Sequence, residues 1–99
     1  MKRLSYSDFA TDDLKVILDY SARDKPTAAR SFVDAIIDTC HSIAANPEIG
    51  MRREDLAPVL RLFTHRGYGI YYRNLDAEVL AERVLHPSLD VRLQTFGEP

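Results

Sequence analysis

A long stretch between two prolines, Pro26 and Pro47, carries apolar residues at a helical spacing and constrains the fold more than any other part of the sequence. Its apolar positions recur every three or four residues, at Ala29, Phe32, Val33, Ile36, Ile37, Cys40, Ile43 and Ala44. This pattern predicts a helix of about four turns that buries one broad face. Proline fits the first helical position but disfavours helical geometry in the residue before it, so the helix is expected to begin at Pro26 and to end at Asn46-Pro47.

A shorter helix with its own apolar stripe is expected before this one. Ser7 is suited to cap its N-terminus, and acidic residues follow in the first turns, where exposed backbone amides and the helix dipole favour negative charge. The stripe consists of Ala10, Leu14, Ile17 and Leu18. Because only a short turn separates the two helices, we expect them to pack as an antiparallel hairpin. The alternation from Lys2 to Tyr6 predicts a short strand in front of the hairpin.

After Pro58 the sequence becomes rich in aromatic and β-branched residues, which predicts strands. Three segments of this kind are separated by turn-forming residues: Val59–His65, Tyr68–Arg73 and Glu78–His86. We therefore expect one α+β domain over residues 1–99, with an N-terminal strand, an antiparallel helical hairpin and then a three-stranded antiparallel sheet. The connection from Asn46 to Pro58 has no clear period, and a connection this long in a small domain is more often functional or partly helical than idle.

The alternation within these strands predicts which side chains face the helices. In the first two strands we expect three apolar residues to do so: Leu60, Leu62 and Ile70. In the third strand two pairs compete for the core face: Val79 with Ala81, and Leu80 with Val84. Either Arg83 or Glu82 then lies close to apolar packing, or a β-bulge shifts the phase of the strand, and the sequence leaves these alternatives open.

The charge of the chain is nearly balanced but unevenly distributed. Thirteen basic residues face 15 acidic ones, which gives a net charge of −2 and argues against bulk affinity for nucleic acid. Acidic residues gather in the first predicted helix, whereas three arginines and no acid lie between residues 56 and 75. No apolar run long enough to span a membrane and no secretory leader are present, so we expect a cytoplasmic protein in which the single cysteine, Cys40, is a buried apolar residue.

Spacing rules argue against several kinds of catalytic site. The three histidines, His41, His65 and His86, fall on different predicted elements without neighbouring ligands at metal-site spacing. The Gly67-Tyr68-Gly69 segment lacks the following helix that a phosphate-binding loop needs, and hairpin geometry explains it better. No nucleophile-elbow motif surrounds any serine. We therefore predict no catalytic residue, no metal site and no cofactor.

Arginine and tyrosine residues on neighbouring predicted strands form the strongest local signal. Five of them fall within this part of the sequence: Arg61, Tyr71, Tyr72, Arg73 and Arg83. One interpretation is a sheet face that gathers guanidinium groups and aromatic rings for a phosphate or a protein partner. The equally weighted alternative is structural, with the tyrosines at the edge of the core and the arginine stems covering apolar surface.

Several short segments occur in an order typical of one known family. They are Asp13-Leu14, Ala28-Ala29-Arg30-Ser31-Phe32-Val33, Asn46-Pro47-Glu48-Ile49-Gly50, Leu60-Arg61-Leu62-Phe63, Tyr68-Gly69-Ile70-Tyr71-Tyr72-Arg73 and Arg83-Val84-Leu85-His86. Together they cover nearly the whole chain, which resembles the ParE branch of the ParE/RelE toxin superfamily. The resemblance implies a β-α-α-β-β-β fold and the toxin half of a type II toxin-antitoxin pair of the kind linked to plasmid stabilisation.

The other branch of the superfamily, RelE, comprises ribosome-dependent messenger RNA endoribonucleases, and its catalytic pattern is not matched here. Where that branch has lysines, this sequence has Leu60 and Leu62, and where it has an arginine after a Gly-Tyr pair, this sequence has Gly69. The tail from Pro87 contains no tyrosine or lysine. Arg61, Arg83 and His86 are the groups that an unusual ribonuclease site would use, and this activity is kept as an alternative.

The resemblance to the ParE branch implies inhibition of DNA gyrase by binding. Target-binding candidates are Arg61, Arg73, Arg83 and His86. A ParD-like antitoxin is expected to form a hetero-oligomer with the chain, through an amphipathic helix on the helical hairpin and an added strand at a sheet edge. Antitoxin-binding candidates are Leu18, Phe32, Phe63 and Tyr72, although residues of this kind also suit the core. No sequence-specific nucleic-acid binding by the chain alone and no membrane partner are expected. A non-toxic protein that only binds antitoxin is the remaining alternative.

Overall fold

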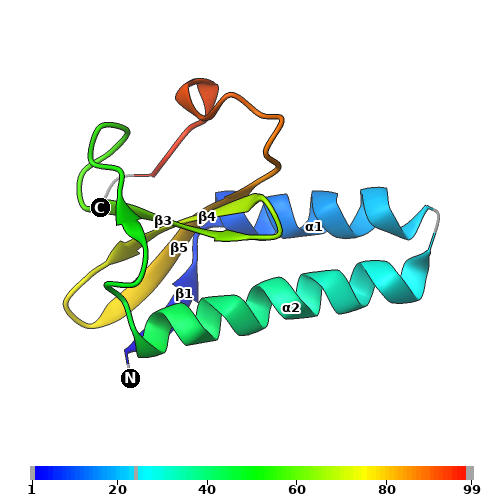
Figure 1. Ribbon diagram of the computed structural model, residues 1–99, viewed down its shortest axis with the longest axis horizontal. Helices are drawn as coiled ribbons and strands as arrows, with labels where there is room; N and C mark the ends of the chain where they lie inside the picture. Colours follow the sequence, from blue (N-terminus) through cyan, green and yellow to red (C-terminus); the bar gives the residue numbers. More distant parts are fainter. Residues whose placement is uncertain (1, 24, 98–99) are drawn as a thin grey trace.

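The structure, a computed structural model, describes residues 2–23 and 25–97 and consists of a helical hairpin packed on one mixed sheet (Figure 1). The elements are β1 (Arg3–Tyr6), α1 (Asp8–Ala22), α2 (Pro26–Ala45), β2 (Met51–Arg52), β3 (Leu60–His65), β4 (Tyr68–Asn74), β5 (Glu78–Leu85) and a short 3-10 turn, η1 (Val91–Leu93). The expected α+β fold and the order of its elements are confirmed. None of the helices in these ranges is long and apolar enough to cross a membrane.

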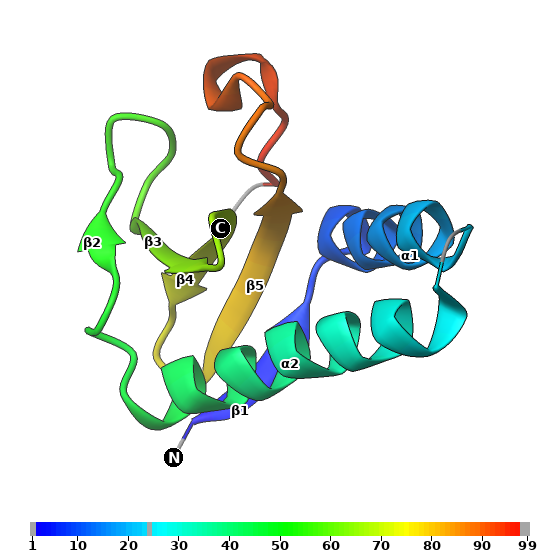
Figure 2. The same cartoon turned by 45° about the vertical axis from the view of Figure 1, so that its right-hand side comes forward.

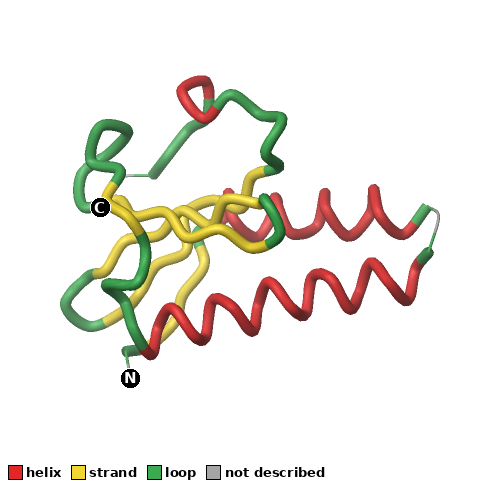
Figure 3. Tube along the Cα trace, in the orientation of Figure 1, coloured by secondary structure: helices red, strands yellow, loops and turns green. Residues whose placement is uncertain are grey.

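The ends of both helices follow from the residues that the sequence places there. The Ser7 hydroxyl oxygen accepts a hydrogen bond from the Ala10 amide (3.0 Å) and caps α1. Pro26 occupies the start of α2, and the Asn46 amide closes the other end by donating to two helix carbonyls. The two helices lie antiparallel, side by side, as the short turn predicts (Figure 3).

The sheet has five strands in the order β1-β5-β4-β3-β2, and β1 runs parallel to β5. The expected sheet of three antiparallel strands is therefore its centre, to which the N-terminal strand adds at one edge and β2 at the other (Figure 2). The 46–58 connection, which was expected to be functional or partly helical, contains no helix. It contributes β2, which pairs with β3 through only two residues. A strand this short carries no recognisable alternation.

The facing predicted for the first two central strands was right for Ile70 and wrong for Leu60 and Leu62. The two-residue turn at Arg66 and Gly67, both with positive φ, sets a register in which Phe63 pairs with Ile70. Leu60 and Leu62 therefore lie on the opposite face of the sheet from the helices. There they pack in a second cluster with Tyr71, Leu85, Leu56, Ala57, Val91 and Phe96.

A β-bulge decides among the alternatives for the third central strand. Tyr71 pairs with Arg83 but Tyr72 pairs with Ala81, so Glu82 is the extra residue. The phase shift places Val79, Ala81 and Val84 together against the helix-side core. Glu82 itself is buried on the other face, beside Arg73.

The helix-side core also buries the single cysteine, as predicted. Cys40 is 1% exposed and packs among Ile36, Ile43 and the strand residues of the main cluster. Burial raises the pKa of its thiol from 9.0 to about 11, while the nearby Tyr6 hydroxyl lowers it by a smaller amount. At neutral pH this thiol is protonated and enclosed, which suits a packing role.

Candidate functional site

Arg61 and Tyr72, which are predicted to contact partners, both contact the chain segment that leaves α2. The Tyr72 hydroxyl donates to the Pro47 carbonyl (2.7 Å) and accepts from the Gly50 amide (2.9 Å). Arg61 Nη1 donates to the carbonyl oxygens of Gly50 (2.7 Å) and Glu48 (3.3 Å). Tyr72 is fully buried, and burial raises the pKa of its hydroxyl. Both residues therefore fix the turn between α2 and β2.

Arg73 and Arg83 are also engaged in internal contacts. Arg73 is 1% exposed and lies 3.1 Å from the Glu82 carboxylate. Arg83 forms a two-pronged ion pair with Asp13, with contacts of 2.8 and 2.9 Å, and its Nη1 donates to the Thr95 carbonyl. The three sheet arginines proposed for target binding thus lie in separate places and do not form one basic surface.

The residues predicted to bind antitoxin lie at different depths. Leu18 lines a surface groove between α1 and α2. Phe32 and Phe63 are half-buried and pack against the main core, and Tyr72 is inside it. Of the four candidates, Leu18 alone lines that groove.

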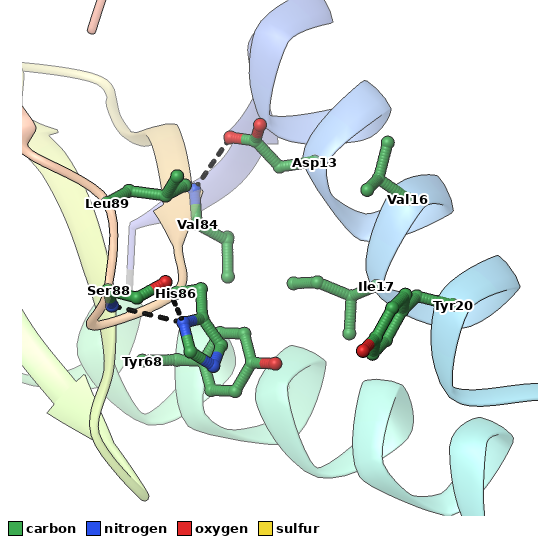
Figure 4. A pocket seen from close by; sticks show the side chains of 9 residues that line it. All are labelled: Asp13, Val16, Ile17, Tyr20, Tyr68, Val84, His86, Ser88 and Leu89. Atoms are coloured by element: carbon green, nitrogen blue, oxygen red, sulfur yellow. Dashed lines mark hydrogen bonds between the residues drawn. The ribbon is translucent and has the colours of Figure 1, made fainter. Parts of the chain in front are cut away.

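His86, by contrast, lies exposed at the end of β5 and lines a pocket of about 340 Å³ (Figure 4). We call this cavity the His86 pocket. It lies between α1 and the C-terminal end of β5. Its lining residues are Asp13, Val16, Ile17, Tyr20, Tyr68, Val84, His86, Ser88 and Leu89.

Hydrogen bonds set the tautomer of the His86 ring within this pocket. The Ser88 backbone amide donates to His86 Nδ1 (3.0 Å), and the Ser88 hydroxyl lies 2.7 Å from the same nitrogen. Because a backbone N–H can only donate, Nδ1 is the acceptor and the neutral ring carries its proton on Nε2. The Tyr68 ring stands perpendicular to the imidazole at 5.2 Å between centroids, and Phe32 supports Tyr68 from behind in a second edge contact.

The rim of the His86 pocket is apolar and open to solvent. Val16 is 66% exposed, Tyr20 72% and Leu89 49%. Sequence reasoning missed the two α1 residues because they lie off the buried stripe of that helix. Phe9, Val16 and Tyr20 form a second apolar stripe at i, i+7 and i+11, which was the available signal.

The chemistry of the His86 pocket suits binding better than phosphodiester cleavage. Its nine lining residues, all in the described part of the chain, include no lysine or arginine to stabilise a transition-state phosphate. Asp13 accepts three hydrogen bonds, two from Arg83 and one from the Val84 amide (2.9 Å), so its carboxylate oxygens are taken up by contacts that join α1 to β5. What remains is a mainly apolar cavity whose polar groups are the His86 imidazole and the hydroxyls of Tyr20, Tyr68 and Ser88.

A second surface feature is the groove along the outer side of the helical hairpin, which we call the hairpin groove. Two hollows of about 370 and 180 Å³ share Leu18 and Val33 and so form one continuous depression. Its walls are mainly apolar, from Leu14, Leu18, Val33 and Ile37, and its charged lining residues are Lys15, Arg30 and Asp34. These features are typical of a groove that accepts an amphipathic helix.

The other two histidines, His41 and His65, lie apart from the His86 pocket and are not part of a metal site among the described residues. His65 Nδ1 lies 3.0 Å from the Thr39 hydroxyl, and its ring lies next to Phe32. His41 is exposed on α2 and lines the hairpin groove. Across residues 2–23 and 25–97, no group of three or more His, Cys, Asp and Glu residues could hold a metal ion.

Comparisons with known proteins agree with the resemblance seen in the sequence. A family profile described as "ParE toxin of type II toxin-antitoxin system, parDE" matches residues 4–90. A solved structure titled "Chromosomal ParDE TA system from P. aeruginosa" has the same fold, with a TM-score of 0.75 and 23% sequence identity over 87% of this chain and 96% of that one. A search of curated proteins gave no match. The family match spans most of the chain, and the chain therefore belongs to the ParE toxin family of type II toxin-antitoxin systems.

Proposed function

We propose that the chain is a cytoplasmic toxin that inhibits DNA gyrase by binding it, thereby blocking replication, and that a ParD-like antitoxin neutralises it. The observation that carries this proposal is the His86 pocket, an apolar cavity with an exposed apolar rim. Exposed apolar residues around a cavity are typical of protein-protein contact sites, where a few anchors supply most of the binding energy. The chain's membership of the ParE toxin family supports gyrase as the target.

The placement of the arginines supports inhibition by binding over RNA cleavage. Cleavage requires a base, an acid and a cation around one phosphate. Arg83 is paired with Asp13, and neither Arg83 nor Arg61 lines the His86 pocket, so His86 has neither of them as a partner. The ribonuclease alternative therefore lacks its cation at this pocket.

The hairpin groove is the surface we propose for the antitoxin. The groove has mainly apolar walls, and Lys15, Arg30 and Asp34 leave it one net positive charge, which fits an amphipathic helix that is acidic on its polar side. The groove shares no lining residue with the His86 pocket. Neutralisation would then not require the antitoxin to fill the target-binding pocket.

Induced expression of the chain without antitoxin tests this function in cells. We expect filamentous cells with DNA-damage signalling, because a blocked gyrase stops replication while protein synthesis continues. Rapid translation arrest with cleaved messages would contradict the proposal in favour of the ribonuclease alternative. Normal growth with confirmed expression of folded protein would contradict it in favour of a non-toxic antitoxin-binding protein.

Replacing Leu18 with Ala is expected to weaken antitoxin binding by about tenfold or more, because Leu18 lines both parts of the hairpin groove. Calorimetry measures this change, as the difference in affinity of the original chain and of Leu18→Ala for the ParD-like antitoxin. A matched control is Leu93→Ala, which truncates an exposed leucine on η1, outside the groove. Equal affinities for both variants would exclude the hairpin groove as the antitoxin site.

A further inference from the structure

Two arginines lie directly opposite each other at the outer edge of the sheet. Arg52 on β2 pairs with Arg61 on β3 in an antiparallel register, so both side chains leave the same face. Like charges in this position repel each other and destabilise a strand pair. An anion placed between the two guanidinium groups would reduce this repulsion and stabilise the pairing of the two-residue strand β2 with β3.

The two arginines line a pocket of about 290 Å³ together with Glu54, Val59, Leu60 and Asn74. We call it the β2-edge pocket. Arg61 uses only Nη1 for backbone carbonyls, and Arg52 has no ion pair or hydrogen bond within residues 2–23 and 25–97. Lys2 Nζ donates to Asn74 Oδ1 (2.7 Å), which fixes the amide and leaves its NH2 group to donate elsewhere. Several donors are thus available in one cavity.

The backbone beside this pocket is strained. Val59 has φ +58°, in the left-handed region that β-branched residues rarely adopt. Strain of this kind persists where the surrounding structure enforces it, and it gathers at ligand-binding sites. Val59, which lines the pocket, is also 47% exposed.

We propose that the β2-edge pocket binds an acidic side chain from an extended, partly apolar peptide segment of a protein partner. The charge of the lining fits this ligand, because two arginines and Glu54 leave one net positive charge, which a single carboxylate neutralises. The exposed apolar side chain of Val59 in the lining fits a peptide and would contribute little to binding a nucleic-acid backbone. The site shares no lining residue with the His86 pocket or the hairpin groove and does not depend on gyrase inhibition.

Titration of the full chain with capped five-residue peptides, followed by NMR, tests the proposal. One peptide alternates Val and Glu, and a second replaces each Glu with Gln. We expect the acidic peptide to shift the Nε–Hε signals of Arg52 and Arg61 and to bind at least tenfold more tightly than the neutral one. Arg52→Gln should weaken binding about tenfold, whereas Arg92→Gln, an equal charge change on an exposed arginine outside the pocket, should not.

Three results would overturn the proposal. The first is equal binding of the two peptides, or no shift of either arginine signal. The second is equal weakening by Arg52→Gln and Arg92→Gln, which would indicate unspecific attraction to surface charge. The third is tighter binding of a short DNA duplex than of the acidic peptide at the same two arginines, which would assign the pocket to phosphate groups.

Discussion

Replacing Arg73 with Met is expected to lower the free energy of unfolding by about 3 to 5 kcal/mol. Arg73 and Glu82 are each 1% exposed and lie 3.1 Å apart, on the face of the sheet away from the helices. Glu82 Oε2 has no hydrogen-bond partner among the described residues, so the charge of Arg73 is its main compensation. Removing Arg73 leaves an uncompensated buried carboxylate, and urea unfolding at pH 7 measures the loss.

The double variant Arg73→Met with Glu82→Leu is the control for this prediction. It replaces both charges with apolar groups and should regain most of the lost stability, because buried ion pairs are often exchangeable for apolar contacts. A single variant as stable as the original chain would show that the pair is not buried as described. A double variant no better than the single one would show that Arg73 matters for packing and not for charge.

The same pair predicts a pH dependence with a definite sign. Burial raises the pKa of Glu82 above its ordinary value of 4.5, and the nearby Arg73 lowers it by a smaller amount. A carboxyl group with a raised pKa contributes most stability below pH 4.5 and loses that contribution as the pH rises through its folded-state pKa. The stability lost in the Arg73→Met variant should therefore be smaller near pH 4.5 than at pH 7.

Replacing Asp13 with Ala is expected to lower the free energy of unfolding by about 2 to 3 kcal/mol and, because Asp13 also lines the His86 pocket, to weaken gyrase inhibition as well. The Asp13 and Arg83 side chains are 14% and 12% exposed, and Asp13 joins α1 to β5 through three hydrogen bonds. Arg83→Ala should have a similar effect, because it breaks the same contact. Thermal unfolding and supercoiling inhibition, compared at equal concentrations of folded protein, measure both variants.

This pair of variants separates two roles for Arg83. If Arg83 acts only by holding α1 against the sheet, both variants weaken gyrase inhibition to the same extent per folded molecule. If Arg83→Ala abolishes inhibition while Asp13→Ala retains it, the guanidinium group touches the target and the structural role given to it here is wrong.

The regular parts of the fold were predictable because their signals are local. The 3.6-residue apolar period predicts both helices, and Ser7 and Pro26 mark where they begin. The short turn between the helices predicts that they pack as a hairpin. The facing of Leu60 and Leu62 was not predictable, because it depends on a register fixed by the left-handed turn at Arg66 and Gly67. The bulge at Glu82 was foreseen as one alternative, and only the pairing with β4 decided it.

The candidate site was harder to predict because its parts come from distant segments. His86 was singled out from its place at the end of a strand, but its neighbours Tyr68, Val16 and Tyr20 come from a hairpin and from α1. The contact of Asp13 with Arg83 joins residues 70 positions apart and leaves no local pattern. Periodicity predicts which face of an element is apolar, not which elements will meet.

Inhibition of gyrase supercoiling by the purified chain tests the central claim most directly, with Val16→Glu as the decisive variant. Val16 is 66% exposed at the rim of the His86 pocket, so the substitution should leave the fold intact and place a charge where an apolar contact is proposed. The control Leu93→Glu makes the same kind of change on η1, outside the pocket.

We predict that the original chain and Leu93→Glu inhibit supercoiling at similar concentrations. Val16→Glu should require at least about tenfold more protein for the same inhibition, which is equivalent to about 1.4 kcal/mol of binding free energy. Absence of inhibition by the folded original chain, or equal inhibition by Val16→Glu, would contradict the account.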